Sequence, residues 1–153
     1  MSNAIEDRLT ELGVSLATPP APAANYVPFM ITGNQIYVSG QISMTADGPI
    51  TGRLGDGMSV EEGAAAAKVC AINLLSQVKV ALGGDMSRLK RVLKLTAFVN
   101  SAPDFTQQPQ VVNGASDFLV AALGDNGRHA RSAVGAVLPL GVAVEIEGIF
   151  EFE

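Results

Sequence analysis

The feature that most constrains the fold is a strict alternation of apolar and acidic residues near the C-terminus. From Val142 to Phe152 the even positions are apolar or small, whereas Glu145, Glu147 and Glu151 occupy odd positions. A period of two is typical of a β-strand with one face packed and the other facing water or cations. The chain therefore needs a sheet with a covering layer on one face.

Two segments have the periodicity of helices that could form this layer. Ser59 and Glu62 form a capping box, which predicts that a long helix begins there and ends at Gly83-Gly84. Its predicted apolar stripe consists of Ala65, Val69, Ile72, Leu75 and Val78. A second helical region is predicted from Pro103-Asp104 to about Leu123. Its predicted buried face consists of Val111, Val112, Ala115, Phe118, Leu119 and Ala122.

The remaining regular segments are predicted to be strands. Their expected ranges are Phe29 to Thr32 and Gln35 to Ser39 around a Gly33-Asn34 turn, then Val92 to Asn100, and Ala130 to Val137. Residues 3–12 are predicted to form a short helix, and residues 45–57 a flexible surface loop. The order predicts an α/β (α+β) fold in which a mixed sheet has two helices packed on one face. The other face would be covered by another subunit.

Composition limits the compartment and the partners. Hydrophobic residues make up 48% of the 153 residues and charged residues 16%, so part of the apolar surplus is expected in a subunit interface. We expect a cytoplasmic protein, because no apolar run approaches the length of about 18 residues that a membrane span needs and no signal-peptide core is present. The single cysteine, Cys70, is predicted to be structural.

The charge distribution makes nucleic acid an unlikely partner. The net charge is −5, and the one basic group alternates with apolar residues as on the solvent side of a strand. That group consists of Arg88, Lys90, Arg91 and Lys94.

Several short motifs resemble one family in the correct order. They are Tyr26-Val27, the run from Gly33 to Ile42, Ala130-Arg131-Ser132, Leu138-Pro139, and the run from Val144 to Glu147. Together these are similar to the signatures of the YjgF family, also called Rid for reactive intermediate deaminase and known too as L-PSP endoribonuclease-like. The similarity begins near residue 17, which makes the chain a single domain over residues 1–153 with residues 1–18 as an N-terminal extension. The resemblance implies a chorismate-mutase-like fold, a homotrimer, and pockets between subunits.

The resemblance also implies an activity and a set of site residues. The expected reaction is hydrolysis of small 2-imino acids or enamines to 2-keto acids and ammonia, with no cofactor. Arg131 matches the arginine that pairs with the substrate carboxylate, and Glu145 the glutamate near the attacking water. Tyr26, Ser39 and, more loosely, Asn113 match pocket residues.

Two departures from the family pattern indicate a divergent subgroup. One is the long Gly-rich loop around Gly52-Arg53-Leu54-Gly55, where the best-known members have a short loop. The family often has Pro-Ala-Arg-Ser-Cys where this chain has His129-Ala130-Arg131-Ser132-Ala133, so the family cysteine is absent. Backbone groups near Ala133 could still hold the imine nitrogen.

Several alternatives stay open at this point. Arg131 could form a structural ion pair with a glutamate, Glu145 could belong to a solvated strand face, and His129 could be either structural or a proton relay. No metal site is expected, since one histidine without a cysteine partner leaves only carboxylates. A trimeric binding or regulatory module for small carboxylates is the alternative function. Ribonuclease activity is disfavoured by the acidic charge.

Overall fold

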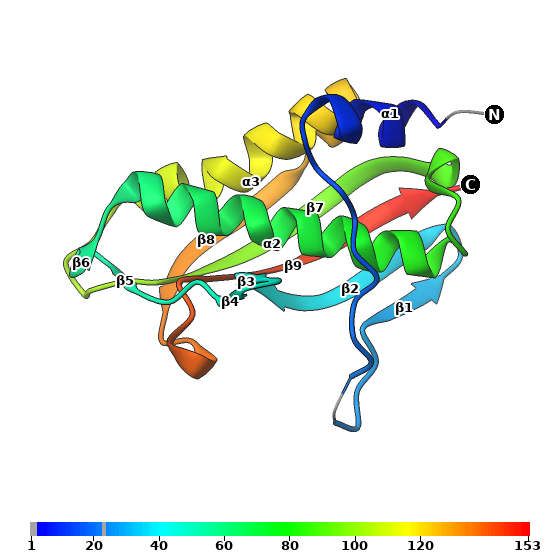
Figure 1. Cartoon of the computed structure of the whole chain (residues 1–153). Coiled ribbons are helices and arrows are strands. Elements are labelled where there is room, and N and C mark those ends of the chain that lie inside the picture. The colour runs from blue at the N-terminus through cyan, green and yellow to red at the C-terminus, as the bar shows by residue number, and fades with distance from the viewer. Residues whose placement is uncertain (1–2, 23) are drawn as a thin grey trace.

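The computed structural model describes residues 3–22 and 24–153, and its centre is one five-stranded mixed sheet (Figure 1). The strand order is β1-β2-β9-β7-β8, in which only β7 and β8 are parallel. The strands are β1 (Phe29–Thr32), β2 (Gln35–Ile42), β7 (Leu89–Asn100), β8 (Ala130–Ala136) and β9 (Val144–Phe152). The predicted mixed α+β fold is confirmed, and β8 forms one edge of the sheet.

Two helices, α2 (Val60–Ala81) and α3 (Gln108–Leu123), cover one face of this sheet (Figure 1). The Ser59 Oγ accepts from the Glu62 backbone N at 3.1 Å, as the capping box predicts. All of the residues predicted for the buried face of α3 are buried. The helix begins later than predicted, because residues 103–104 form a turn, residues 105–107 are irregular, and Pro109 favours the first helical turn. Short 3-10 helices lie at Met86–Arg88, Gly124–Gly127 and Pro139–Gly141.

The predicted apolar stripe of α2 is partly wrong. Ala65 is exposed, and Val69 and Ile72 are only half-buried. The buried face instead consists of Gly63, Ala66, Ala67, Cys70, Ala71, Leu74, Leu75, Ser76, Gln77 and Val78. Small residues on this face allow α2 to approach α3 closely, and periodicity alone could not choose among so many alanines.

Helix α2 also corrects the expectation that no segment is apolar enough for a membrane span. Its 22 residues meet the length and composition of a spanning helix. Half of its most apolar window is buried inside the protein, as is usual for the core helix of a globular domain.

The predicted loose loop at residues 45–57 is anchored to the domain. It contains two small strand pairs, formed by β3 (Met44–Thr45) with β4 (Gly48–Pro49) and by β5 (Arg53–Leu54) with β6 (Gly57–Met58). The Leu54 side chain is completely buried, and Asn100 Nδ2 donates to the Gly52 carbonyl at 2.8 Å. Contacts between distant residues therefore hold a segment that looks flexible in the sequence.

The N-terminal region packs on the helices. Helix α1 (Ala4–Glu11) buries Leu9 in the core, and Arg8 Nε donates to the Ala121 carbonyl of α3 at 2.9 Å. Residues 14–22, which we call the N-terminal strap, then cross α2 in an extended conformation (Figure 1).

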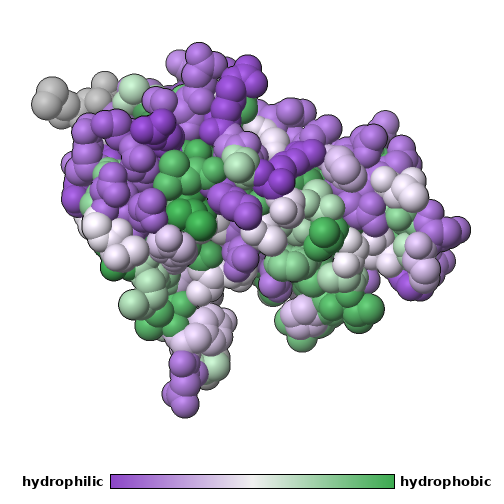
Figure 2. Space-filling view, turned by 180° about the vertical axis from the view of Figure 1, so that it is seen from behind, coloured by the Kyte–Doolittle hydropathy of each residue, from purple (hydrophilic) through white to green (hydrophobic). Residues whose placement is uncertain are grey.

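The sheet face opposite the helices is uncovered in the single chain. Met30, Tyr37 and Val134 are 63%, 43% and 46% exposed, and Val137 and Leu140 project from the β8–β9 connection. Seen from behind, apolar surface gathers over the β1–β2 side and around this connection (Figure 2). This is the surface that the sequence predicts for a subunit contact.

Candidate functional site

Arg131 lies on the edge strand β8 and points toward the helix side of the sheet. In the register it is opposite Leu95, which is fully buried beneath the helices. Its Nη1 donates to Ser116 Oγ at 3.0 Å, and its Nη2 donates to the Pro109 carbonyl at 3.1 Å. Two groups of α3 therefore hold the half-buried guanidinium in one orientation.

The guanidinium has no carboxylate partner among the described residues. The structural ion pair considered for Arg131 is thus not present in the described part of the chain. Both of its acceptors are neutral, so its charge is not compensated and further N–H donors remain free. A half-buried, oriented and uncompensated guanidinium is suited to bind a small anion such as a carboxylate.

His129 continues the hydrogen-bond chain that orients Arg131. Its Nδ1 lies 2.6 Å from the Gly127 carbonyl, and its Nε2 lies 2.9 Å from Ser116 Oγ. A carbonyl only accepts, so Nδ1 carries the proton and Nε2 accepts from the Ser116 hydroxyl. The Ser116 oxygen can then accept from Arg131. This arrangement favours a positioning role for His129 over the proton relay considered from the sequence.

We expect acid to disrupt this chain. Burial and then the nearby Arg131 charge lower the pKa of His129 from its usual value, although the Gly127 carbonyl opposes the shift. Because the folded pKa lies below the unfolded value near 6.5, the neutral ring stabilises the fold fully above about pH 6.5. That contribution decreases as pH falls through 6.5 toward the folded pKa. Protonated Nε2 can no longer accept from Ser116, so anion binding at Arg131 should change in this range.

The measurement is the affinity for 2-ketobutyrate by calorimetry between pH 5 and 8, for the wild type and His129→Gln. The glutamine keeps a donor and an acceptor but does not titrate. The affinity of His129→Gln for 2-ketobutyrate should therefore lack the pH dependence that comes from titration of His129, the only histidine in the sequence. Identical profiles for the two proteins would contradict the positioning role.

Other predicted residues surround Arg131, and one functional residue was missed. Asn113 lies on the same face of α3 as Pro109 and Ser116, at helical spacing between them, and is exposed. Ala133 follows Arg131 on the same side of β8 and is half-buried. Ser116 was not predicted. Its spacing from Asn113 was the available signal, but only the fold places it beside Arg131. We call Arg131, His129, Ser116, Asn113 and Ala133 the Arg131 half-site.

A second group surrounds Glu145. The half-buried Glu145 carboxylate lies against Gly40, where an added Cβ would be 2.6 Å from Oε2. Ser39 Oγ donates to the Val27 carbonyl at 2.7 Å and ties β2 to the segment that carries the exposed Tyr26. Burial, and then the charge of Glu147, raise the pKa of Glu145. A raised pKa suits a carboxylate that exchanges a proton with water near neutral pH. We call Glu145, Gly40, Ser39 and Tyr26 the Glu145 half-site.

One chain does not bring the two half-sites together. Glu145 is opposite Phe98 in the register, and Phe98 is opposite the exposed Val134, so Glu145 faces the open side of the sheet. Arg131 faces the helix side. Strands β9 and β7 lie between β2 and β8, which puts Ser39 about 14 Å away across three strand spacings. A pocket that contains both half-sites requires a second copy of the chain.

The structure supports the interpretation of Cys70 as structural. The thiol is buried in α2 and donates to the Val144 carbonyl at 3.4 Å. Burial, and then the Glu145 charge, raise its pKa, so it stays protonated and unreactive. Within residues 3–22 and 24–153, no group of three or more His, Cys, Asp or Glu side chains is arranged to hold a metal ion.

Comparisons with known proteins agree with this architecture. A family model described as "YjgF/chorismate mutase-like, putative endoribonuclease" matches residues 6–147. Protein TCP17 of Trypanosoma cruzi is 48% identical, with 98% of this chain and 95% of that protein covered. Protein HMF1 of Saccharomyces cerevisiae is 33% identical over 85% of this chain and 86% of its own length. The crystal structure of Atu1372 from Agrobacterium tumefaciens, a protein of unknown function, is 49% identical with a TM-score of 0.91, and 98% of this chain and 93% of that chain are covered. The chain therefore belongs to the YjgF/chorismate mutase-like family.

Proposed function

We propose that the chain forms a homotrimer that hydrolyses small 2-imino acids, or their enamine tautomers, to 2-keto acids and ammonia. Each active site would combine the Arg131 half-site of one copy with the Glu145 half-site of its neighbour. The observation that carries the proposal is the Arg131 guanidinium, which is held by the neutral Ser116 and Pro109 acceptors without a carboxylate among the described residues. Family membership supports the same assignment.

The uncovered sheet face supports assembly. Met30, Tyr37 and Val134 are apolar or aromatic side chains on that face, and a partner would remove them from water. The separation of the half-sites would make catalysis depend on assembly. A single chain would bind an anion at Arg131, but the Glu145 carboxylate that activates water would lie on the other side of its sheet.

The proposed reaction needs only residues of this chain. Arg131 binds the substrate carboxylate through paired N–H donors and so fixes the C=N carbon. Glu145 takes a proton from a water molecule, whose oxygen forms a bond to that carbon while the nitrogen gains a proton. The carbinolamine then loses its nitrogen as ammonia, and the hydroxyl proton leaves as the carbonyl forms. Unpaired backbone groups of the edge strand near Ala133 are available to the nitrogen.

The test is keto-acid formation from an imino acid produced in situ by an amino-acid oxidase acting on 2-aminobutyrate. We expect saturable acceleration above spontaneous hydrolysis, and a loss of about a hundredfold or more in kcat for Glu145→Gln, as for removal of a general base. Glu151→Gln is the matched control. Glu151 is a glutamate on the same strand, but its carboxylate pairs with Arg91 and lies outside the proposed site. If the protein accelerates the hydrolysis of no small imino acid, the proposed enzymatic activity is contradicted.

The same proteins test the alternative of a binding or regulatory module. Saturable heat with 2-ketobutyrate, lost in Arg131→Ala and unaccompanied by turnover, would favour that module. Ribonuclease activity is the weaker candidate, because basic residues on β7 are paired with acidic groups, Arg91 with Glu151 at 3.1 Å and Lys90 with Glu153 at 3.4 Å. The cytoplasmic location stays a prediction.

A further inference from the structure

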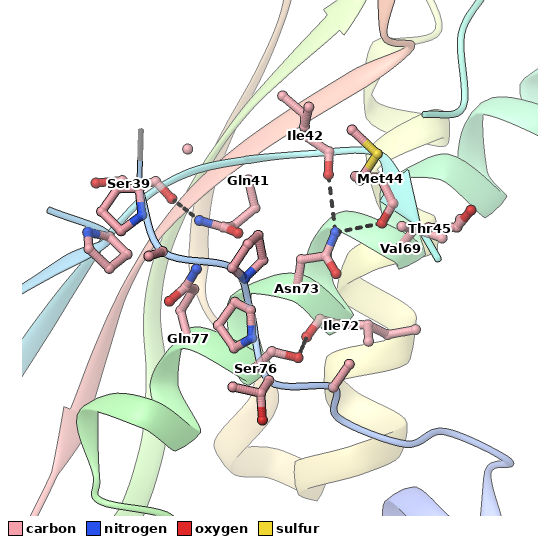
Figure 3. Close-up of a pocket in the computed structure, with 18 of the residues that line it drawn as sticks. Ser39, Gln41, Ile42, Met44, Thr45, Val69, Ile72, Asn73, Ser76 and Gln77 are labelled. Carbon is pink, nitrogen blue, oxygen red and sulfur yellow. Dashed lines mark hydrogen bonds between the residues drawn. The ribbon is translucent and has the colours of Figure 1, made fainter. Parts of the chain in front are cut away.

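A cavity of about 630 Å³ lies between the N-terminal strap and helix α2 (Figure 3). Its walls are mostly apolar. Prolines of the strap form one side, Val69 and Ile72 of α2 form the opposite side, and Ile42 and Met44 close one end. Val69 and Ile72 are two of the α2 residues that the sequence pattern assigned to the core, and their place on this cavity explains why they are only half-buried. Its volume is in the range of about 300–1,000 Å³ that is typical of small-molecule sites.

The polar side chains that line this cavity are uncharged. No Asp, Glu, Lys, Arg or His side chain is among the described residues that line it. Asn73 Nδ2 donates to the Ile42 and Met44 carbonyls at 3.2 and 3.0 Å, and Ser76 Oγ donates to the Ile72 carbonyl at 3.1 Å. These bonds fix the wall and leave the Asn73 carbonyl oxygen available as an acceptor (Figure 3).

Gln77 adds a second carboxamide to the cavity. Its side chain lines the cavity and is only 6% exposed, yet its amide has no hydrogen-bond partner among the described residues. Figure 3 draws it rising from α2 toward the strap. The polar atoms of this amide keep contact with the space of the cavity, so they are available to form hydrogen bonds with a ligand group.

We infer that this cavity binds an uncharged, mainly apolar small molecule that carries an amide or lactam group. The carboxamide of Gln77 offers a donor and an acceptor side by side, and an amide offers the complementary pair. The apolar body of the ligand contacts Val69, Ile72 and the strap prolines. An ionised ligand is disfavoured because the lining contains no opposite charge to compensate its desolvation.

This cavity adjoins the proposed active site. Its lining shares Tyr26, Ser39 and Gly40 with the Glu145 half-site, but it includes no residue of the Arg131 half-site. The inference therefore does not rest on the deaminase activity.

Binding of hexanamide, compared with hexanoate, tests the inference on the wild-type protein. The two probes share an apolar chain and differ in charge and in the N–H donors. We expect saturable calorimetric binding of hexanamide, and binding of hexanoate at least about tenfold weaker because its charge stays uncompensated. Equal binding of the two probes, or no saturable binding of hexanamide, would overturn the inference.

Matched variants locate the bound probe. Ile72→Trp should fill the cavity and abolish hexanamide binding, whereas Val80→Trp, on the exposed side of the same helix, should leave it unchanged. Gln77→Leu keeps the size and removes the amide, and should weaken binding about fivefold, the effect of one neutral hydrogen bond. Arg131→Ala should have no effect. Binding that survives Ile72→Trp in a folded protein, or is lost in Arg131→Ala, would show that the probe occupies another site.

Discussion

Replacing Arg131 with lysine is expected to lower kcat/KM for small 2-imino acids by at least about tenfold, and replacement with alanine by about a hundredfold. A charge-assisted bond to a carboxylate contributes about 1.5–3 kcal/mol, which corresponds to these factors. Lysine keeps the charge but lacks the planar fork that contacts Ser116 Oγ, the Pro109 carbonyl and an incoming carboxylate together.

The measurement is the separate determination of kcat and KM, together with the calorimetric affinity for 2-ketobutyrate. Arg128→Lys is the matched control, because Arg128 is exposed and pairs with Asp125 at 3.3 Å. Wild-type kinetics and affinity in Arg131→Lys would show that this guanidinium does not anchor the substrate. Size-exclusion chromatography with light scattering on each variant separates loss of the site from loss of assembly.

Replacing Gly114 with alanine is expected to lower the free energy of unfolding by about 3 kcal/mol or more. A Cβ on Gly114 would lie 2.0 Å from the backbone oxygen of Ala64 and 2.7 Å from its carbonyl carbon. Backbone atoms cannot rotate away as a side chain can, so α3 would have to move away from α2. For a chain of this size, 3 kcal/mol corresponds to a fall in melting temperature of roughly 6–12 °C.

The control for this prediction is the same substitution on the partner helix. A Cβ at Gly63 would meet the tips of Leu54 and Val111, at 2.8 and 3.1 Å, and these side chains can adjust. Alanine also favours helix formation over glycine. Gly63→Ala should therefore cost much less in thermal and denaturant unfolding. Equal stability of the two variants would contradict the close contact at Gly114.

Local periodicity was a reliable guide wherever one element has one buried face. The alternation that ends at Phe152 and the buried stripe of α3 are both confirmed. Periodicity failed on α2, because alanines lie on several sides of this helix. Which side is buried depends on the element that packs against it. Periodicity also failed at residues 45–57, because the burial of Leu54 depends on contacts far away in the sequence.

The candidate site also has features that follow from local residue spacing and features that depend on contacts between distant elements. His129 and Arg131 are two residues apart, a spacing that puts side chains on one side of an extended chain, and both side chains reach Ser116 of α3. Their connection through Ser116 joins strand β8 to helix α3, so the sequence did not reveal it.

The sequence by itself determined the helices, the strands and the family, because these depend on side-chain alternation and on motifs read along the chain. Tertiary structure decided that Arg131 is held without a carboxylate partner among the described residues, that Glu145 faces the other side of the sheet, and that Gln77 lines a cavity without a described partner. The physical reason is the strand order β1-β2-β9-β7-β8, which differs from the order in the chain. Which side chains become neighbours is set by how strands and helices pack, and no local pattern encodes that packing.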